Sequence, residues 1–307
     1  MRIIITGATG LIGTKLSSQL AKRGDDVTVF TRSPDIPRKE LNYKIKFEKW
    51  DYNKPKEWRD SLNGKDAVIH LAGANLNAKR WNDRYKKIVY DSRINSTRQL
   101  VNAIKDCEDK PKILITASAV GIYGDREDDL LTENSDFGND FLSKLCTDWE
   151  KEAEKIEEYN VRRVSLRIGY ILSREDGLLK KLFLPFKFFI GGPLGHGRQW
   201  FPWIHIEDLM SIFHYVLENE KLKGAINCAS PEKVRMKDFA DAFGNTLNRP
   251  SLFPVPKFVL KIIAGEIANA VVSSQKISVD KLLEGGFKFK YDTLNEALKN
   301  LLNKDIP

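Results

Sequence analysis

The chain has 307 residues, 42% of them hydrophobic, and a formal net charge of +8. These values are ordinary for a globular protein with one large domain, or a domain and a smaller lobe, around a substantial core. The cations are spread along the chain without a dense basic block, so we expect anionic small molecules rather than nucleic acid as partners. The three cysteines, Cys107, Cys146 and Cys228, are far apart and odd in number, which argues against a disulfide framework and a thiolate metal site.

No signal-peptide pattern precedes the first predicted strand, and no apolar run of about 20 residues occurs. We therefore expect a cytoplasmic protein with a small-molecule substrate and without a membrane partner. No set of metal ligands is predicted.

The clearest motif lies at the start of the chain. Residues 2–6 form a β-branched apolar run that predicts a buried parallel strand, and residues 11–20 begin an amphipathic helical pattern. Between them, Gly7-x-x-Gly10-x-x-Gly13 would permit a tight turn, the approach of a pyrophosphate, and close packing of helix on strand. Amide groups and the dipole at a helix N-terminus favour phosphate charge, so this stretch predicts a dinucleotide site.

The end of the second predicted strand, residues 26–31, indicates which dinucleotide to expect. An acidic side chain there would bind the ribose 2′-hydroxyl of NAD, whereas this chain has Thr31-Arg32-Ser33. A guanidinium beside a hydroxyl suits a 2′-phosphate, and no carboxylate repels it, so NADP is favoured over NAD. The alternative is that Arg32 only opens a surface loop. A third strand over residues 44–50 ends at Asp51, a predicted contact for the adenine edge.

Further short apolar runs occur at residues 66–72, 112–117, 161–168 and 225–229, with helical segments between them. Recurring strands and helices predict parallel βαβ units and therefore an α/β fold with a Rossmann-type doubly wound parallel sheet. His70 lies inside one of these runs and is expected to be a satisfied core histidine.

We expect residues 1–170 and 203–244 to form an NADP-binding Rossmann domain, and residues 171–202 and 245–307 to form a smaller, mostly helical substrate lobe. The predicted cofactor contacts are Gly7, Thr9, Gly10, Leu11, Ile12, Gly13, Thr31, Arg32, Ser33, Asp51, Leu71, Ala72 and Gly73.

These stretches resemble the extended short-chain dehydrogenase/reductases, the group that includes nucleotide-sugar epimerases and dehydratases. The closer resemblance is to an atypical branch described as epimerase family proteins, whose C-terminal segment is specific to the branch. It extends nearly from end to end of the chain. The matching stretches are 7–13, 70–73 with Asn75, 79–81, 92–94, 118–124, 140–150, 191–208, 249–250, 255–256, 265–266, 282–283, 286–287 and 296–298.

The resemblance implies proton transfer by a Tyr-x-x-x-Lys pair on one helix, with help from an upstream serine and an asparagine. When Glu150 sets the register, Leu142 stands at the tyrosine position and Cys146 at the lysine position. A shift of two residues would put Lys144 at the lysine position but Asp140 at that of the tyrosine. Helix geometry disfavours the shift because Lys144 is turned off the apolar stripe of the other two residues. Both registers lack the tyrosine.

Three residues remain as catalytic candidates. Ser118 matches the upstream serine of the family, although its spacing to Tyr123 is one residue longer than usual. Tyr123 could be a substitute acid or a structural aromatic residue. Cys146 could lie beside the nicotinamide, but its place on an apolar stripe favours a buried structural thiol. Loss of general acid–base catalysis slows a reaction by about 10²- to 10⁴-fold without forbidding it.

The leading hypothesis is an NADP(H)-binding, epimerase-like oxidoreductase of unassigned substrate. A catalytically silent NADP-binding sensor or scaffold is the alternative, and a nucleotide-sugar epimerase or dehydratase is the third. Both a monomer and a homodimer are compatible with the sequence. The predicted substrate contacts, which would suit an anionic or planar ligand, are Asn75, Arg80, Trp81, Arg93, Arg198 and Trp200.

Overall fold

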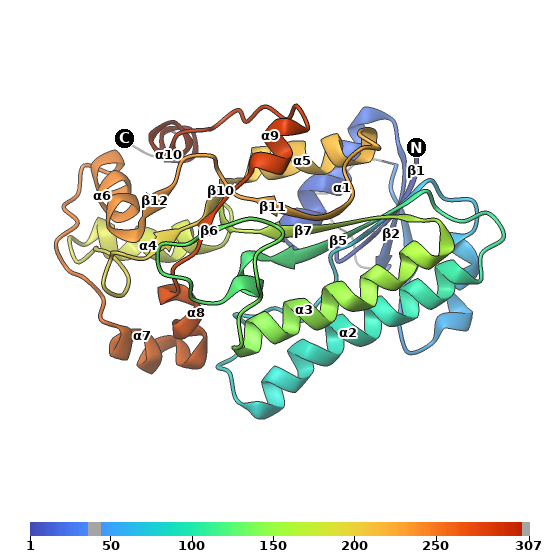
Figure 1. Cartoon of the computed structure of the whole chain (residues 1–307), viewed down its shortest axis with the longest axis horizontal. Helices are drawn as coiled ribbons and strands as arrows, with labels where there is room; N and C mark the ends of the chain where they lie inside the picture. Colours follow the sequence, from blue (N-terminus) through green and yellow to red (C-terminus); the bar gives the residue numbers. More distant parts are fainter. Residues whose placement is uncertain (36–43, 303–307) are drawn as a thin grey trace.

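The computed structural model describes residues 1–35 and 44–302. Its centre is a seven-stranded sheet in the order β11-β7-β5-β4-β1-β2-β3, in which every neighbouring pair is parallel (Figure 1). The chain begins in the sheet at β1, proceeds to β3 at one edge, and then returns beside β1 to build the other half. This is the doubly wound order of a Rossmann fold, so the predicted fold class is confirmed. The strands are β1 (Arg2–Thr6), β2 (Asp26–Thr31), β3 (Lys46–Lys49), β4 (Ala67–His70), β5 (Ile113–Ala119), β7 (Arg162–Ile168) and β11 (Gly224–Cys228).

The apolar run of β1 is buried because helices cover both faces of the sheet. Ile3 and Ile5 belong to the core on one face, whereas Ile4 belongs to the core on the other. This alternation follows from the two-residue period of a strand. Helices α1 (Leu11–Arg23) and α5 (Ile206–Glu218) cover the first face, and α2 (Asp83–Lys105) and α3 (Phe141–Glu154) cover the second (Figure 1).

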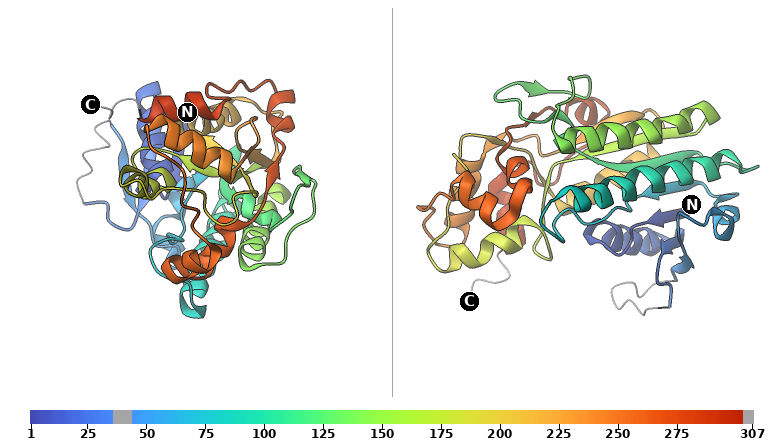
Figure 2. Two further views of the ribbon diagram at one scale, coloured as in Figure 1. Left: turned by 90° about the vertical axis from the view of Figure 1, so that its left-hand side faces the viewer. Right: turned by 90° about the horizontal axis from the view of Figure 1, so that it is seen from below.

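The remaining elements gather mainly at one end of the molecule, which faces the viewer in the left panel of Figure 2. Three two-stranded sheets support this end: β8 (Tyr170–Leu172) with β10 (Trp203–His205), β9 (Trp200–Phe201) with β12 (Val234–Arg235), and β6 (Leu130–Leu131) with β13 (Lys276–Ile277). Its helices are α4 (Leu178–Lys187), α6 (Met236–Thr246), α7 (Lys257–Ala264), α8 (Ala268–Val272) and α10 (Leu294–Leu302). Helix α9 (Asp280–Glu284) lies instead against β11 of the main sheet (Figure 1). Short 3₁₀ turns are η1 (Pro55–Glu57), η2 (Arg59–Leu62), η3 (Val120–Tyr123), η4 (Lys155–Tyr159) and η5 (Gly265–Ile267).

Helix α6 packs with the smaller lobe. It lies against α10, and the Phe243 ring meets the Phe186 ring of α4 edge-on at 4.9 Å. The sequence places residues 203–244 with the Rossmann domain. We propose instead that α6 be counted with the lobe, because its apolar side chains face α4 and α10. Among the described residues, no helix is both long and apolar enough to traverse a bilayer.

Candidate functional site

The turn from β1 into α1 is built on backbone packing. Gly7 has a φ of 71°, and a Cβ atom on it would lie 2.6 Å from the carbonyl carbon of Leu71. On Gly13, a Cβ atom would lie 2.5 Å from both the Cα of Ala8 and the carbonyl oxygen of Gly7. Real Cβ atoms do not approach backbone this closely. Both positions therefore require glycine to bring the turn against β4 and the helix against β1.

Gly10 has a different surrounding. A Cβ atom there would meet nothing closer than the carbonyl oxygen of Gly7, at 3.7 Å. Gly10 is the N-cap of α1, no described side chain caps this helix, and its first turn carries no acidic residue. The backbone amides at the helix start therefore suit a phosphate group, and the open face of Gly10 leaves it room to approach. These features fit the pyrophosphate of a dinucleotide.

A cleft of about 700 Å³ lies beside this turn, at the ends of β1, β2, β3 and β4. This volume is in the usual range of small-molecule sites. The predicted cofactor contacts that line it are Gly7, Thr9, Thr31, Arg32, Asp51, Ala72 and Gly73. Thr9, Gly10 and Leu11 also line a neighbouring hollow over α1. Leu11, Ile12 and Leu71 are half-buried and pack against the main core, and Ser33 directs its backbone N–H to the Thr31 hydroxyl at 3.3 Å.

Arg32 lies exposed at the cleft, directly after β2. It forms no ion pair with any residue of 1–35 or 44–302. Asp51 lines the same cleft, and its Oδ1 accepts hydrogen bonds from the backbone and side-chain nitrogens of Asn53. The guanidinium is therefore available to a ligand, whereas Asp51 is held in place by its own loop.

His70 at the end of β4 is a structural residue, as the sequence predicts. It is fully buried, with Nδ1 2.7 Å from the Thr6 hydroxyl and Nε2 3.0 Å from the Thr97 hydroxyl. Thr6 also accepts the backbone N–H of Leu71 and of Ala72. Burial lowers the pKa of His70 to about 3, with a further contribution from the charge of Arg93. The neutral imidazole thus joins β1, β4 and α2 and shapes the cleft wall.

Ser118 near the end of β5 belongs to a buried charged network. Its hydroxyl donates to Glu150 Oε1 of α3 at 2.6 Å, and Arg167 of β7 donates to both oxygens of Glu150, at 3.0 and 2.8 Å. Burial disfavours the charge of Arg167, but the hydrogen bonds and charge of Glu150 outweigh it and raise the pKa of the guanidinium. The pair is therefore an ionised bridge between sheet and helix, with Ser118 attached to it.

Tyr123 is fully buried in the same network. Its hydroxyl donates to Asn227 Oδ1 at 2.7 Å and accepts from Arg167 at 2.8 Å. Burial raises the pKa of Tyr123 to about 12, even though Arg167 acts in the opposite direction. The hydroxyl thus both donates and accepts a hydrogen bond within the protein. This favours the interpretation of Tyr123 as a structural residue.

Cys146 lies one helical turn before Glu150 and is buried. Burial raises the pKa of Cys146 to about 12, and the charge of Glu150 adds to the rise, so the side chain is a neutral thiol. Leu142, one turn earlier, is half-buried against Gly121. Lys144 is exposed and pairs with Asp148 at 2.7 Å, away from β5. The helix thus presents Leu142 and Cys146, not Lys144, to the site.

Three of the predicted substrate contacts, Asn75, Arg80 and Trp81, lie in the segment between β4 and α2. The Asn75 carbonyl accepts the Tyr85 hydroxyl at 2.5 Å. The indole N–H of Trp81 donates to the Leu76 carbonyl at 2.9 Å, and its ring is buried. Arg80 donates to the Lys261 carbonyl at 3.3 Å and so joins this segment to α7.

Arg93 of α2 lies beside this segment. Its Nη1 donates to the Ala74 carbonyl at 3.1 Å and to the Val89 carbonyl at 3.2 Å. The guanidinium carbon is 5.2 Å from the Trp149 ring centroid, and a Cβ atom on Gly73 would lie 2.8 Å from it. Burial lowers the pKa of Arg93, and no carboxylate of the described residues pairs with it. The cation lies behind Gly73 and Ala74, which line the cleft, and no carboxylate of the described residues compensates its charge there.

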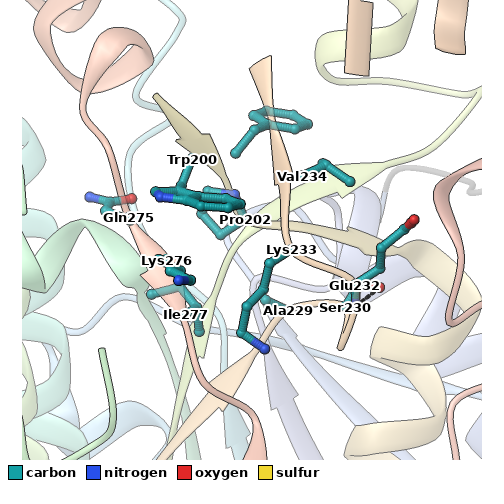
Figure 3. A pocket seen from close by; sticks show the side chains of 11 residues that line it. Trp200, Pro202, Ala229, Ser230, Glu232, Lys233, Val234, Gln275, Lys276 and Ile277 are labelled. Atoms are coloured by element: carbon teal, nitrogen blue, oxygen red, sulfur yellow. Dashed lines mark hydrogen bonds between the residues drawn. The ribbon is translucent and has the colours of Figure 1, made fainter. Parts of the chain in front are cut away.

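Arg198 and Trp200 have other neighbours. The Trp200 indole N–H donates to Asp128 at 2.6 Å, and the cations of Arg235 and Lys276 lie over its ring. The Arg198 carbonyl accepts a hydrogen bond from Arg235. The hollow beside Trp200 in Figure 3 measures about 10 Å³, which is room for about one water molecule. Trp200 therefore lines no ligand-sized space there.

The sequence pattern predicts no role for Arg167 or for Asn227, and Glu150 serves there only to set the register of the helix. One signal was present: three arginines occur in β7, where an apolar strand was expected. A cation in a buried strand requires a partner, but a single sequence does not show which carboxylate supplies it. No cluster of potential metal ligands occurs in the described ranges.

Comparison with known proteins agrees with this arrangement. Residues 3–229 match the NAD dependent epimerase/dehydratase family, and residues 255–301 match a domain of unknown function, DUF1731. The chain is 37% identical to the chloroplastic epimerase family protein SDR39U1 homolog of Arabidopsis thaliana, over 98% of this chain and 87% of that protein.

Two solved structures share the whole fold. The human epimerase family protein SDR39U1, crystallised with NADPH, is 32% identical with a TM-score of 0.88, and the match covers 99% of both chains. A nucleoside-diphosphate sugar epimerase from Corynebacterium glutamicum is 29% identical with a TM-score of 0.77, over 99% of this chain and 58% of that one. The glycine turn, the sheet order and these matches agree: the chain belongs to the NAD-dependent epimerase/dehydratase family.

Proposed function

We propose that the protein binds NADP(H) in the cleft at the ends of β1 to β4 and acts as an epimerase-like oxidoreductase on a small, anionic substrate. The observation that carries the proposal is Arg32, an exposed guanidinium at the end of β2 in a cleft whose glycine turn fits a pyrophosphate. The human relative crystallised with NADPH supports the choice of cofactor.

The cofactor would be held by residues with distinct roles. The α1 amides after Gly10 would bind the pyrophosphate, Arg32 with Thr31 and Ser33 the 2′-phosphate, and Asp51 the adenine edge. When bound, NADPH supplies a hydride, or NADP accepts one.

Ser118 is the residue that best suits contact with the substrate. Its proton is directed to Glu150, so its oxygen lone pairs are available to accept a hydrogen bond from a substrate hydroxyl. Glu150 and Arg167 are positioning residues in this account, because they hold the Ser118 hydroxyl through the buried pair. Arg93 would bind the anionic group of the substrate.

The alternative is an NADP-binding sensor or scaffold without turnover. It is favoured by one observation, namely that the positions where the wider family has tyrosine and lysine carry Leu142 and a neutral thiol. Substrate conversion that depends on bound NADP would exclude it. A nucleotide-sugar epimerase, such as the relative from Corynebacterium glutamicum, is the third candidate, and it depends most on the missing pair.

The test of the proposal is a comparison of the two dinucleotides. We expect Arg32→Glu to weaken NADPH binding by about 10- to 100-fold, the size of a lost charge-assisted hydrogen bond, with little effect on NADH. Fluorescence titration of both cofactors measures this, and Arg59→Glu, at an exposed arginine outside the cleft, is the matched control. Equal losses for NADPH and NADH, or no loss, would contradict the NADP assignment.

A further inference from the structure

The smaller lobe exposes an unusual amount of apolar surface. Nine of the fourteen large hydrophobic side chains that are exposed in the described residues fall within residues 184–190 and 252–263. Their exposed fractions are large, for example 65% for Phe188 and 66% for Ile262. Single exposed hydrophobic residues are normal on a protein surface, but a cluster of this kind marks a binding surface.

The two segments lie together. The backbone N–H of Phe253 donates to the Gly191 carbonyl at 3.1 Å, and that of Val255 donates to the Pro193 carbonyl at 2.9 Å. The Arg249 guanidinium lies over the Phe189 ring at 4.6 Å. Helices α4 and α7 accordingly lie at the same end of the molecule in Figures 1 and 2. We refer to residues 180–190 and 249–263 as the basic apolar face.

Helix α7 is amphipathic in an uncommon way. Phe258 and Ile262, one helical turn apart, are both exposed, and Lys257 and Lys261 are exposed beside them. Val259 and Leu260 are half-buried on the opposite side and hold the helix to the lobe. The outer side of α7 therefore combines apolar and cationic side chains, whereas an ordinary surface helix exposes mainly polar ones.

The charge of this face has a single sign. No aspartate or glutamate occurs in residues 177–206 or 242–265. Its five exposed lysines form no ion pair within the part of the chain that the structure describes; they are Lys180, Lys181, Lys187, Lys257 and Lys261. The face therefore complements an anionic surface. It repels a second copy of itself, because a two-fold contact would bring the same lysines face to face.

We propose that the basic apolar face docks the protein on the surface of a bilayer that contains anionic lipids. The side chains of Phe188, Phe258 and Ile262 would enter the headgroup region, and the lysines would bind lipid phosphates. Each of these three side chains is about two-thirds exposed, which suits insertion into a lipid interface. Such docking needs no helix that crosses the membrane, and it departs from the sequence-based expectation of no membrane partner.

Co-sedimentation of the full chain with vesicles tests this docking. One set contains equal parts of phosphatidylglycerol and phosphatidylcholine, and the other contains phosphatidylcholine alone. We expect binding to the anionic set only. This binding should be lost at 0.5 M NaCl, because the Debye length falls to about 4 Å at that salt concentration. Phe258→Ser with Ile262→Ser, and separately Lys257→Glu with Lys261→Glu, should each reduce binding by about tenfold or more.

The matched control is Leu283→Ser with Lys288→Glu, an exposed apolar residue and an exposed lysine outside the face, which should bind as the unaltered protein does. Thermal melting followed by circular dichroism establishes that each variant is folded. Absence of binding to anionic vesicles at low salt overturns the proposal, as does equal binding by the folded α7 variants. Sedimentation velocity that shows a dimer, dissociated by Phe258→Ser with Ile262→Ser, would assign the face to self-association instead.

Discussion

The two halves of the candidate site differ in which part of the chain shapes them: backbone in one half and side chains in the other. The cofactor half, at the ends of β1, β2 and β4, is made of backbone: a Cβ atom on Gly7 or Gly13 would collide with neighbouring main chain. The chemical half, between β5, α3 and β7, is made of side chains, with Ser118 and Arg167 meeting on Glu150. The first half borders an open cleft, whereas in the second the Arg167 guanidinium donates to both Glu150 and Tyr123.

This difference suggests how the protein departs from the wider family. The features that suit a dinucleotide are retained, while the helix that would carry tyrosine and lysine presents Leu142 and Cys146. Charged side chains still occur beside this part of α3, but they are Glu150 and Arg167, which form a buried ion pair with each other. We therefore expect mutations in the chemical half mainly to lower the free energy of unfolding. Mutations in the cofactor half should mainly weaken cofactor binding.

The largest expected effect is on the buried pair. Glu150→Ala leaves Arg167 charged in a buried position, so we expect the free energy of unfolding to fall by about 3–5 kcal/mol. Urea denaturation measures it. Glu154→Ala on the same helix removes an exposed carboxylate 3.8 Å from Arg163 and should cost about 1 kcal/mol or less. If the two variants unfolded at the same urea concentration, the pair would not be the support that the geometry indicates.

Substitutions in the glycine turn can distinguish glycines that are needed for packing from glycines that are needed for cofactor binding. Gly13→Ala forces a Cβ atom against backbone and should lower the free energy of unfolding by about 1–3 kcal/mol. Gly10→Ala meets nothing nearer than 3.7 Å, so it should leave stability unchanged while it weakens NADPH binding by about tenfold, because the methyl group occupies the approach of the phosphate. Thermal melts and NADPH titration of both variants check this. Loss of stability in both would mean that Gly10 is also a packing residue.

Much of the fold could be predicted because its signals are local. The glycine turn occupies one short strand–turn–helix unit, in which the predicted strand at residues 2–6 is β1 (Arg2–Thr6) and the predicted helical pattern begins α1 (Leu11–Arg23). The short strand pairs were missed, since β6 and β13 have two residues each and join distant parts of the chain. Helix α4 was also missed, within a segment assigned only to the lobe.

The chemical half was harder to predict for a related reason. Tyr123 and Asn227 are 104 positions apart, and Ser118 and Glu150 are 32 apart. No spacing rule connects such residues, so the sequence leaves open whether Tyr123 is a substitute acid or a structural aromatic residue. The helix register of Cys146 and Lys144, in contrast, followed from the period of one helix, and the exposed Lys144 agrees with it.

A third prediction concerns acid stability of the cofactor half. The pKa of His70 is about 3 in the folded protein, against 6.5 in an unfolded chain, so the unfolded state binds the proton between these values. Stability is therefore complete above pH 6.5 and falls as the pH decreases, by about 2 kcal/mol from His70 between pH 6.5 and 5. Urea denaturation of His70→Asn at both pH values should show a smaller difference. Part of the pH dependence of the free energy of unfolding should remain in this variant, because burial also lowers the pKa of His205, to about 4. An unchanged slope would contradict a neutral His70.

The smallest effect is expected at Cys146. A buried thiol with a pKa of about 12 is neither a nucleophile nor a proton donor at neutral pH, and its contribution is apolar packing. Cys146→Ala should therefore change stability by about 1 kcal/mol or less and leave NADPH affinity unchanged. Iodoacetamide labelling of the folded protein at pH 7, with peptides identified by mass spectrometry, gives an independent measurement. Cys107 and Cys228 are also buried and serve as internal controls. Rapid labelling of Cys146 alone would show that the helix opens there. Cys146 would then again be a candidate for a reacting group.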